Sequence, residues 1–426
     1  MTTQHQARAR GAPLVGEVGP SARDRVGDRP SVAERVIRLD DNRYVLQEPL
    51  QQTGPTAVWC AWDAPLERMV ALRVFRCPTD EFLRALARDA HACLPVSDTH
   101  VQRIERYGRC AASGLVFVEA ELCAEFADGR RRFGKTLAHV RPRSVQEAAR
   151  WALHVALGVD AAHRQGVFHG GLTSDCVWIR PQTRRAQVAH FGQALWRRAD
   201  PGASALEFSP YDCVVLEAPG GGEAPIAGAP CYMAPEQARG TPVHDDEGGL
   251  DGERRRMLID VYGVGAVLYE MLEGVPPYLP QGPVDDPVRD VLSQVRAGPP
   301  LPLGQRREGA GWAAFRAPEQ LQRILARAMA RDPSERYPSV SELARDLAAF
   351  LDGRPSRSDG LRPALRTRLW LRRRGHAIGL GLSVLVSVAA LVAALSLYRQ
   401  VMEARERLHE MEHVIQAARL QGLAGR

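Results

Sequence analysis

The chain has 426 residues, of which 45% are hydrophobic and 25% charged, and this composition excludes a wholly disordered protein and allows two or three domains. Its formal net charge is +6 and its single lysine is Lys135, which excludes chemistry that needs a lysine elsewhere. The eight cysteines include no Cys-x-x-Cys pair and fit no zinc site, and their scatter favours a reducing compartment over a disulfide scaffold.

The N-terminal segment, residues 1–38, is rich in Arg, Gly and Pro and has no sustained hydrophobic period. It lacks the apolar stretch of a signal peptide and is predicted to be a disordered cytosolic tail. Short β-type runs follow at residues 44–46, 57–62, 69–75 and 115–118. Residues 80–94 have apolar side chains at helical spacing. Residues 42–119 are therefore expected to form a small β-rich lobe.

Helical patterns dominate residues 145–353. Helices are predicted at residues 145–164, 259–273, 319–330 and 338–352. The second of these is apolar on nearly all sides, which predicts a buried helix. Stretches rich in Gly and Pro at 218–230 and 276–303 are predicted to be loops. This order indicates an α+β fold with a small β-rich lobe before a larger α-rich lobe.

Residues 377–397 carry no charged side chain. As a helix they span about 31 Å, close to the thickness of about 30 Å of a bilayer core, so a transmembrane helix is predicted. The preceding linker, residues 354–376, is rich in arginine, whereas arginine and glutamate are mixed in residues 398–426. The positive-inside rule therefore predicts a single-pass inner-membrane protein with residues 1–376 in the cytoplasm and the tail outside.

The tail has apolar residues alternately three and four positions apart, the heptad spacing of a coiled coil. These residues are Val401, Ala404, Leu408, Met411, Ile415 and Ala418. Inside the span, Gly379, Ser383 and Ser387 form a line of small residues. Together the two patterns favour a homodimer, and a lone helix with an amphipathic end is the alternative.

Six segments in chain order resemble landmarks of the bacterial Ser/Thr protein kinases of the Hanks type. The most specific is Gly228-Ala229-Pro230-Cys231-Tyr232-Met233-Ala234-Pro235-Glu236-Gln237, which resembles the end of their activation segment. The others are Val70-Ala71-Leu72-Arg73, Gly166-Val167-Phe168-His169, His190-Phe191-Gly192, Asp260-Val261-Tyr262-Gly263-Val264-Gly265, and Arg331-Asp332-Pro333 with Arg336-Tyr337. The resemblance covers residues 42–353 and implies a bilobal kinase fold with an N-lobe at 42–119, a C-lobe at 122–353 and a hinge near Glu119.

The residues that stabilise the fold in this family are present. The resemblance implies that Glu236 and Arg336 form a buried carboxylate–guanidinium clamp between the activation segment and the C-lobe. It implies that Asp260 holds the backbone of the catalytic loop. His169 and Phe191 match two packing residues of the family.

The residues that would bind the phosphates of ATP are replaced. The three glycine positions of the Gly-rich loop correspond to Gln51, Thr53 and Thr56, and only Gly54 remains. Side chains at these positions block the close approach of a phosphate to the backbone, and Pro55 removes an amide donor.

The strand lysine of the family is Arg73, and its helix glutamate is Asp89, so an Arg73–Asp89 ion pair that braces the N-lobe is one expectation. The resemblance assigns an adenine pocket to Val58, Ala71, Glu119 and Trp178. Trp178 stands where a smaller aliphatic residue is usual, which predicts a partly filled pocket.

The catalytic loop lacks the carboxylates of phosphoryl transfer. Gly171 stands at the position of the base, and Cys176 and His190 stand at the two Mg²⁺ ligand positions. A thiol is a poor ligand for this hard cation, so no metal site is expected. Asp175 is the only carboxylate of the loop, and it is either a displaced base or metal ligand or a solvated loop residue.

The chain is therefore predicted to be a membrane-anchored pseudokinase without ATP or Mg²⁺, acting through protein partners as a scaffold or allosteric partner of an active kinase. One alternative is an unorthodox kinase or other nucleotide-transfer enzyme that uses the same cleft with ATP and Mg²⁺. Another is an oligomerising membrane sensor. Nucleic-acid binding is not expected because no basic-aromatic stripe is present. Ser204, Ser209 and Tyr211 are either acceptors for a partner kinase or part of an unregulated insert.

Overall fold

The structure is a computed structural model, and it describes residues 37–39, 43–53, 56–76, 80–127, 129–191, 214–216, 226–240, 250–282, 284–305, 316–356 and 363–423. The chain divides into two compact units. The first comprises Met1–Asp352 with Ser356–Gly360, and the second comprises Gly353–Pro355 with Leu361–Arg426.

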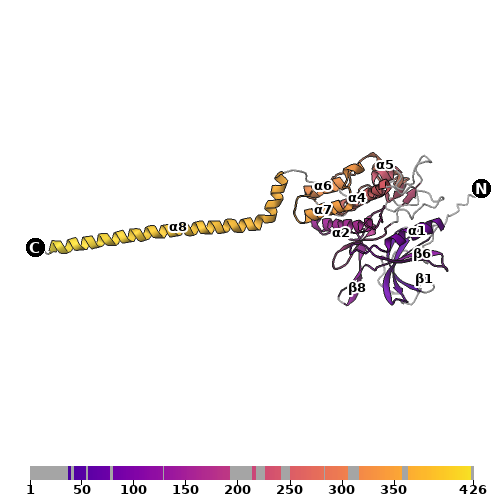
Figure 1. The fold of residues 1–426 in the computed structure, drawn as a ribbon, viewed down its shortest axis with the longest axis horizontal. Helices are drawn as coiled ribbons and strands as arrows, with labels where there is room; N and C mark the ends of the chain where they lie inside the picture. The colour runs from indigo at the N-terminus through magenta and orange to yellow at the C-terminus, as the bar shows by residue number, and fades with distance from the viewer. Residues whose placement is uncertain are drawn as a thin grey trace, which may run out of the picture. The chain divides into compact units, whose positions relative to one another are not determined.

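An antiparallel sheet of six strands in the order β1-β2-β3-β4-β6-β5 forms the N-lobe of the first unit (Figure 1). The strands are β1 (Ile37–Leu39), β2 (Tyr44–Thr53), β3 (Thr56–Asp63), β4 (Arg68–Arg76), β5 (Ile104–Arg109) and β6 (Leu115–Ala120), and helix α1 (Asp80–Cys93) lies between β4 and β5 in the chain. Successive side chains of β4 point to opposite faces of the sheet, as expected for a strand. Val70, Leu72 and Val74 belong to one buried cluster, and Ala71 belongs to another.

The four predicted strands of the N-lobe are present and longer than predicted. Strands β1 and β5 were not predicted, because they are short or partly polar. Ile37 and Arg38 belong to β1, so residues 37–38 of the predicted tail are in the sheet, and the rest of that tail lies outside the described residues.

The C-lobe is built mainly of helices. They are α2 (Val145–His163), α3 (Pro235–Ala238), α4 (Leu250–Glu273), α5 (Pro287–Ala297), α6 (Glu319–Ala328) and α7 (Val340–Leu351). Its short strands are β7 (Ala124–Ala127), β8 (Arg130–Phe133), β9 (Lys135–Thr136), β10 (Val177–Ile179), β11 (Ala186–Val188), β12 (Val214–Leu216) and β13 (Ile226–Gly228). The predicted burial of residues 259–273 is confirmed, because every residue of this part of α4 is buried.

Two of the predicted loops contain regular structure. Helix α5 lies inside the stretch 276–303, where Asp286 caps the helix by accepting a hydrogen bond from the backbone N–H of Arg289 and Pro287 occupies the first turn. Proline is compatible with that position because its missing N–H would have no partner in the helix. Strand β13 lies inside the stretch 218–230 and pairs with β12.

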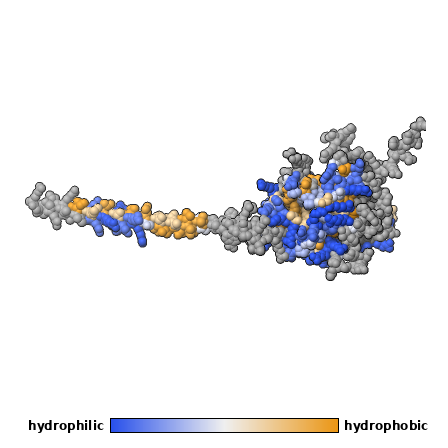
Figure 2. Space-filling view, turned by 90° about the horizontal axis from the view of Figure 1, so that it is seen from above, coloured by the Kyte–Doolittle hydropathy of each residue, from blue (hydrophilic) through white to orange (hydrophobic). Residues whose placement is uncertain are grey.

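The second unit contains one long helix, α8 (Pro363–Leu423), which includes the predicted span, most of the tail and part of the basic linker. Within it, Gly381–His413 is long and apolar enough to cross a membrane, with a mean hydropathy of 2.2 in its most apolar window. Figure 2 shows a continuous hydrophobic section of this helix, followed by a section with hydrophobic and hydrophilic sides.

Candidate functional site

Asp260 of α4 holds the backbone of the catalytic loop. Its carboxylate accepts hydrogen bonds from the backbone N–H groups of His169 (2.8 Å) and Gly170 (2.7 Å), and from His163 Nε2 (2.7 Å). Burial opposes the charge of this carboxylate, but these donors hold the pKa of Asp260 below its usual value. The loop therefore has a rigid, charged support. His163 was not singled out in the sequence, because only the fold brings the end of α2 to α4.

Glu236 and Arg336 form a bidentate ion pair with N–O distances of 2.6 and 2.7 Å. The Arg336 side chain is fully enclosed, and it also donates to the carbonyl oxygens of Ala330 (2.8 Å) and Leu258 (2.9 Å). This pair ties the segment after β13 to the region before α7.

His169 and Phe191 pack against each other below the N-lobe, with ring centroids 5.0 Å apart. His169 Nε2 lies 3.0 Å from the carbonyl oxygen of Ala189, and both rings are buried. These contacts join the catalytic loop to the segment that begins the activation region.

The residues predicted to stand at the positions of the catalytic base and the Mg²⁺ ligands, Gly171, Cys176 and His190, are not carboxylates. Gly171 has no side chain, and Cys176 is buried with its sulfur 3.3 Å from Thr173 Oγ1. His190 has a φ of 70°, a conformation that residues other than glycine rarely adopt. Among the described residues, no group of three or more His, Cys, Asp or Glu side chains could hold a metal ion.

Asp175 lies in the cleft and is bonded by both lobes. Gln51 of β2 in the N-lobe donates from Nε2 to Asp175 Oδ1 at 3.1 Å, and Thr136 Oγ1 lies 3.4 Å from the same oxygen. Gln51 is 9% exposed and Asp175 is partly exposed, so Asp175 is a loop residue that keeps some contact with solvent and also takes part in this contact between the lobes. Gln51, which is predicted from the sequence to stand at the first glycine position of the Gly-rich loop, therefore reaches from one lobe to the other with its side chain.

Trp178 of β10 is 1% exposed and lies in a buried cluster that joins the two lobes. The cluster consists of Val58, Ala71, Cys123, Trp178 and Ala189, with Leu50 and Leu122 packed against it. Three of the four residues assigned to an adenine pocket are therefore packed together, and the indole occupies space between β-strands of the two lobes. The indole Nε1 has no hydrogen-bond partner among the described residues.

The fourth assigned residue, Glu119, points elsewhere. Its carboxylate accepts hydrogen bonds from Tyr44 Oη (2.6 Å) and Arg68 Nη2 (2.7 Å), so it belongs to the interior of the N-lobe. Burial and the adjacent Glu119 carboxylate raise the pKa of Tyr44, which keeps the phenol protonated as a donor.

The remaining predicted site residues lie in the N-lobe and in the activation segment, and the structure describes only some of them. Arg73 lies on β4 between Val58 of β3 and Val118 of β6. The Asp89 side chain on α1 is outside the described residues, so the Arg73–Asp89 pair stays a prediction. Gly54, the side chains of Thr53 and Thr56, and Ser204, Ser209 and Tyr211 also lie outside the described residues, so the predictions made for them stay predictions.

A polar network behind the catalytic loop was missed in the sequence. Tyr232 Oη donates to Glu270 (2.8 Å) and lies 3.0 Å from Ser174 Oγ. Burial raises the pKa of Glu270. Beside this network a small, partly open pocket lies between the catalytic loop and the segment after β13. Gly171 and Ala229 are among the residues that line it.

No protein-family model matches the chain. The chain is 27% identical over 330 residues to the probable serine/threonine-protein kinase PknB of Bifidobacterium longum and 26% identical over 320 residues to PknB of Mycobacterium leprae. These matches cover 74% of this chain and 40% and 44% of the relatives, so the chain spans less than half the length of either. Among solved structures, the PknI kinase domain of Mycobacterium tuberculosis is 18% identical, with coverage of 75% of this chain and 98% of the domain and a TM-score of 0.47.

The two-lobed architecture and the similarity to the two PknB kinases point to the same fold. The chain has a Hanks-type protein kinase fold, and it is similar to bacterial serine/threonine protein kinases. A single apolar helix follows the kinase-like unit in the described chain.

Proposed function

We propose that this chain is a membrane-anchored, kinase-like signalling protein whose kinase-like unit does not transfer phosphate. The observation that carries the proposal is the occupied cleft, in which Trp178 packs between the lobes and Gln51 bonds Asp175. A nucleotide would have to displace the buried indole and break this bond.

The missing carboxylates support the same proposal. Phosphoryl transfer requires carboxylates on Mg²⁺ and a group that orients the attacking hydroxyl. Gly171, Cys176 and His190 supply neither. Loss of one catalytic group can slow a reaction by several orders of magnitude, since each 1.36 kcal/mol of barrier is about tenfold in rate.

The working role that we propose is protein binding at the cytoplasmic face of the inner membrane, as a scaffold or as an allosteric partner of an active kinase. The Asp260 contacts and the Glu236–Arg336 pair support this role, because they keep the C-lobe ordered. ATP and Mg²⁺ are not cofactors in this proposal, and no nucleic acid takes part.

Thermal unfolding of the full chain in detergent, with ATP and with ATP plus Mg²⁺, tests the proposal. A ligand that binds the native state raises the melting temperature by mass action. We expect no shift at millimolar nucleotide, whereas an active relative measured in parallel shifts. A Mg²⁺-dependent shift of this chain would contradict the proposal.

A second candidate is an unorthodox kinase that uses Asp175. This carboxylate lies in the cleft, and the named relatives are kinases. If this candidate holds, the purified chain incorporates phosphate from ATP and Asp175→Asn abolishes incorporation. If the pseudokinase proposal holds, neither protein incorporates phosphate.

A further inference from the structure

One face of helix α8 continues from the predicted span into the tail without a break. Its residues are spaced alternately four and three apart, and they are Ser383, Ser387, Ala390, Ala394, Leu397, Val401, Ala404, Leu408, Met411 and Ile415. We call this face the seam. The small residues of the span and the apolar residues of the tail therefore share one heptad register, although the two patterns arise in different environments.

Inside the predicted span, the two sides of the helix differ in side-chain size. From Ser383 to Ala394 the seam has only serine and alanine, and Leu397 follows at the end of the span, whereas Leu385, Val388, Val392 and Leu395 occupy the opposite side. Small residues allow two helices to approach closely in lipid, where apolar surface alone gives no preference for a partner helix. The Ser387 hydroxyl donates to the carbonyl oxygen of Ser383 at 2.9 Å and so has a partner within the helix.

In the tail, the seam is apolar and exposed. Val401, Leu408, Met411 and Ile415 are 55–58% exposed in the single chain. The opposite side carries polar residues, which are Glu403, Glu406, Glu410 and His413. Figure 2 shows these two sides of the tail as hydrophobic and hydrophilic. A helix with this pattern in water needs a partner for its apolar side.

We propose that a second copy of this chain covers the seam, and that the two copies form a parallel, in-register, left-handed coiled coil through the span and tail. Copies inserted with the same topology meet in parallel. A repeat of 3.5 residues keeps the seam facing the partner when the helices wind left-handedly. This proposal does not depend on whether the kinase-like unit binds nucleotide.

The charges beside the seam fit this partner. With Leu408 at a core position, Arg407 and Glu412 flank the core on opposite sides, five residues apart. In a parallel dimer such residues of the two copies face each other, so Arg407 of each copy meets Glu412 of the other. In the single chain, Glu412 lies 3.4 Å from His409 and is 75% exposed, so it is accessible to a partner.

Cysteine cross-linking of the full chain in its membrane tests the contact. The eight native cysteines all lie between Cys60 and Cys231, so the tail has none. We expect Leu408→Cys to give a disulfide-linked dimer under mild oxidation. Glu406→Cys, the matched control on the opposite side of the helix, is expected to remain monomeric. The proposal is overturned if Leu408→Cys gives no dimer. It is also overturned if Leu408→Cys and Glu406→Cys cross-link equally.

A charge exchange tests the parallel register. We expect Arg407→Glu to weaken self-association about tenfold, because it replaces two attractive pairs with two repulsive ones. The double variant Arg407→Glu/Glu412→Arg is expected to recover the wild-type dimer fraction, measured by energy transfer between labelled copies in vesicles. Arg399→Glu, on the outer side of the helix, is the control. If the double variant is as weak as Arg407→Glu, or if the control is equally weak, the register is wrong.

Discussion

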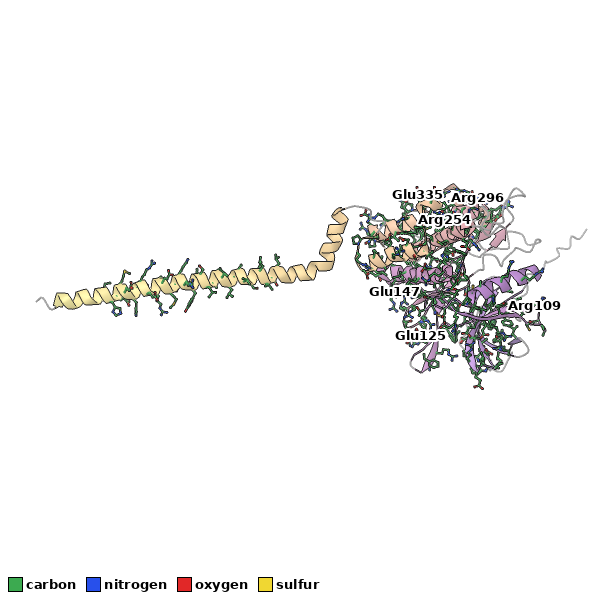
Figure 3. All side chains as sticks on the ribbon, in the orientation of Figure 1. Arg109, Glu125, Glu147, Arg254, Arg296 and Glu335 are labelled. Carbon is green, nitrogen blue, oxygen red and sulfur yellow. The ribbon has the colours of Figure 1, made fainter. Side chains whose placement is uncertain are left out.

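At the scale of single residues, the kinase-like unit keeps the buried charges that support its fold. Figure 3 draws the described side chains of this unit as sticks. Arg336 is 2% exposed and Asp260 is 1% exposed, so both charged groups are buried. Each of these two groups is fully bonded to partners from distant parts of the chain. A buried charge with complete partners is tolerated, whereas loss of one partner leaves the other without compensation.

Replacement of Arg336 is expected to destabilise the unit strongly. Arg336→Ala removes both bonds to Glu236 and two bonds to carbonyl oxygens, and we expect a loss of about 3–5 kcal/mol of unfolding free energy. Arg345→Ala, which breaks a pair between the 60% exposed Arg345 and the partly buried Glu342, serves as the control and should cost less than about 1 kcal/mol. Denaturant unfolding measures the free energy of unfolding of both variants. Equal losses for the two would contradict a special contribution of the buried pair to stability.

A pair of stacked histidines predicts a pH dependence of stability. His154 and His100 stack with centroids 4.4 Å apart, and burial, together with the charges of His100 and nearby arginines, lowers the pKa of His154 to about 4. In the unfolded chain the pKa is about 6.5. The unfolded state therefore binds this proton first, and stability falls as the pH falls from about 6.5 to about 4.

The contribution of His154 is about 1–2 kcal/mol when solvent screening of this partly exposed group is included. His154→Leu is expected to flatten the wild-type loss of stability between pH 6.5 and pH 4 by this amount. His91→Gln, a change at an exposed histidine, should leave the slope unchanged. A His154→Leu slope identical to that of the wild type would rule out this titration.

At the scale of elements, helix α2 can pack where it does because its backbone comes very close to the backbone of another segment. Gly158 of α2 lies against the backbone before β5, and a Cβ atom there would be 2.5 Å from the carbonyl oxygen of His100. A backbone atom cannot move aside as easily as the end of a side chain. Glycine at this helical position therefore allows α2 to reach the N-lobe side of the core.

We expect Gly158→Ala to destabilise the unit by about 1–3 kcal/mol, because the clash exceeds the gain of about 1 kcal/mol that alanine provides in a helix. Gly298→Ala is the control, since a Cβ atom there meets nothing within 4 Å. It should change stability by less than about 0.5 kcal/mol. Thermal unfolding compares the two variants, and a stabilised Gly158→Ala protein would contradict the packing.

At the scale of the whole molecule, the topology proposed from the arginine distribution can be measured directly. If the tail is outside, Glu410→Cys is labelled by an impermeant thiol reagent in intact cells, whereas Ser358→Cys is labelled only after lysis. The wild-type chain gives the background, because its cysteines all lie in the kinase-like unit. The opposite pattern of labelling would reverse the topology.

Local patterns in the sequence were sufficient to predict the main helices and strands. Strands β2, β3, β4 and β6, helix α1 and the buried helix α4 follow from the period and polarity of their own residues. Helix α5 was not predicted, because proline and glycine around it are also typical of loops. Strands of two to four residues carry too little periodicity to be recognised.

The kinase-like order of motifs, the predicted replacement of catalytic residues and the apolar helix could all be inferred from the sequence, since each depends on residues close together in the chain. How the two lobes pack at the cleft could be seen only in the folded chain. Gln51 and Asp175 are 124 residues apart, and no local pattern indicates that they bond. The burial of Trp178 depends on the packing of β10 against β3 and β4. The inward side chain of Glu119 depends on Tyr44 and Arg68, which lie far from it in the chain.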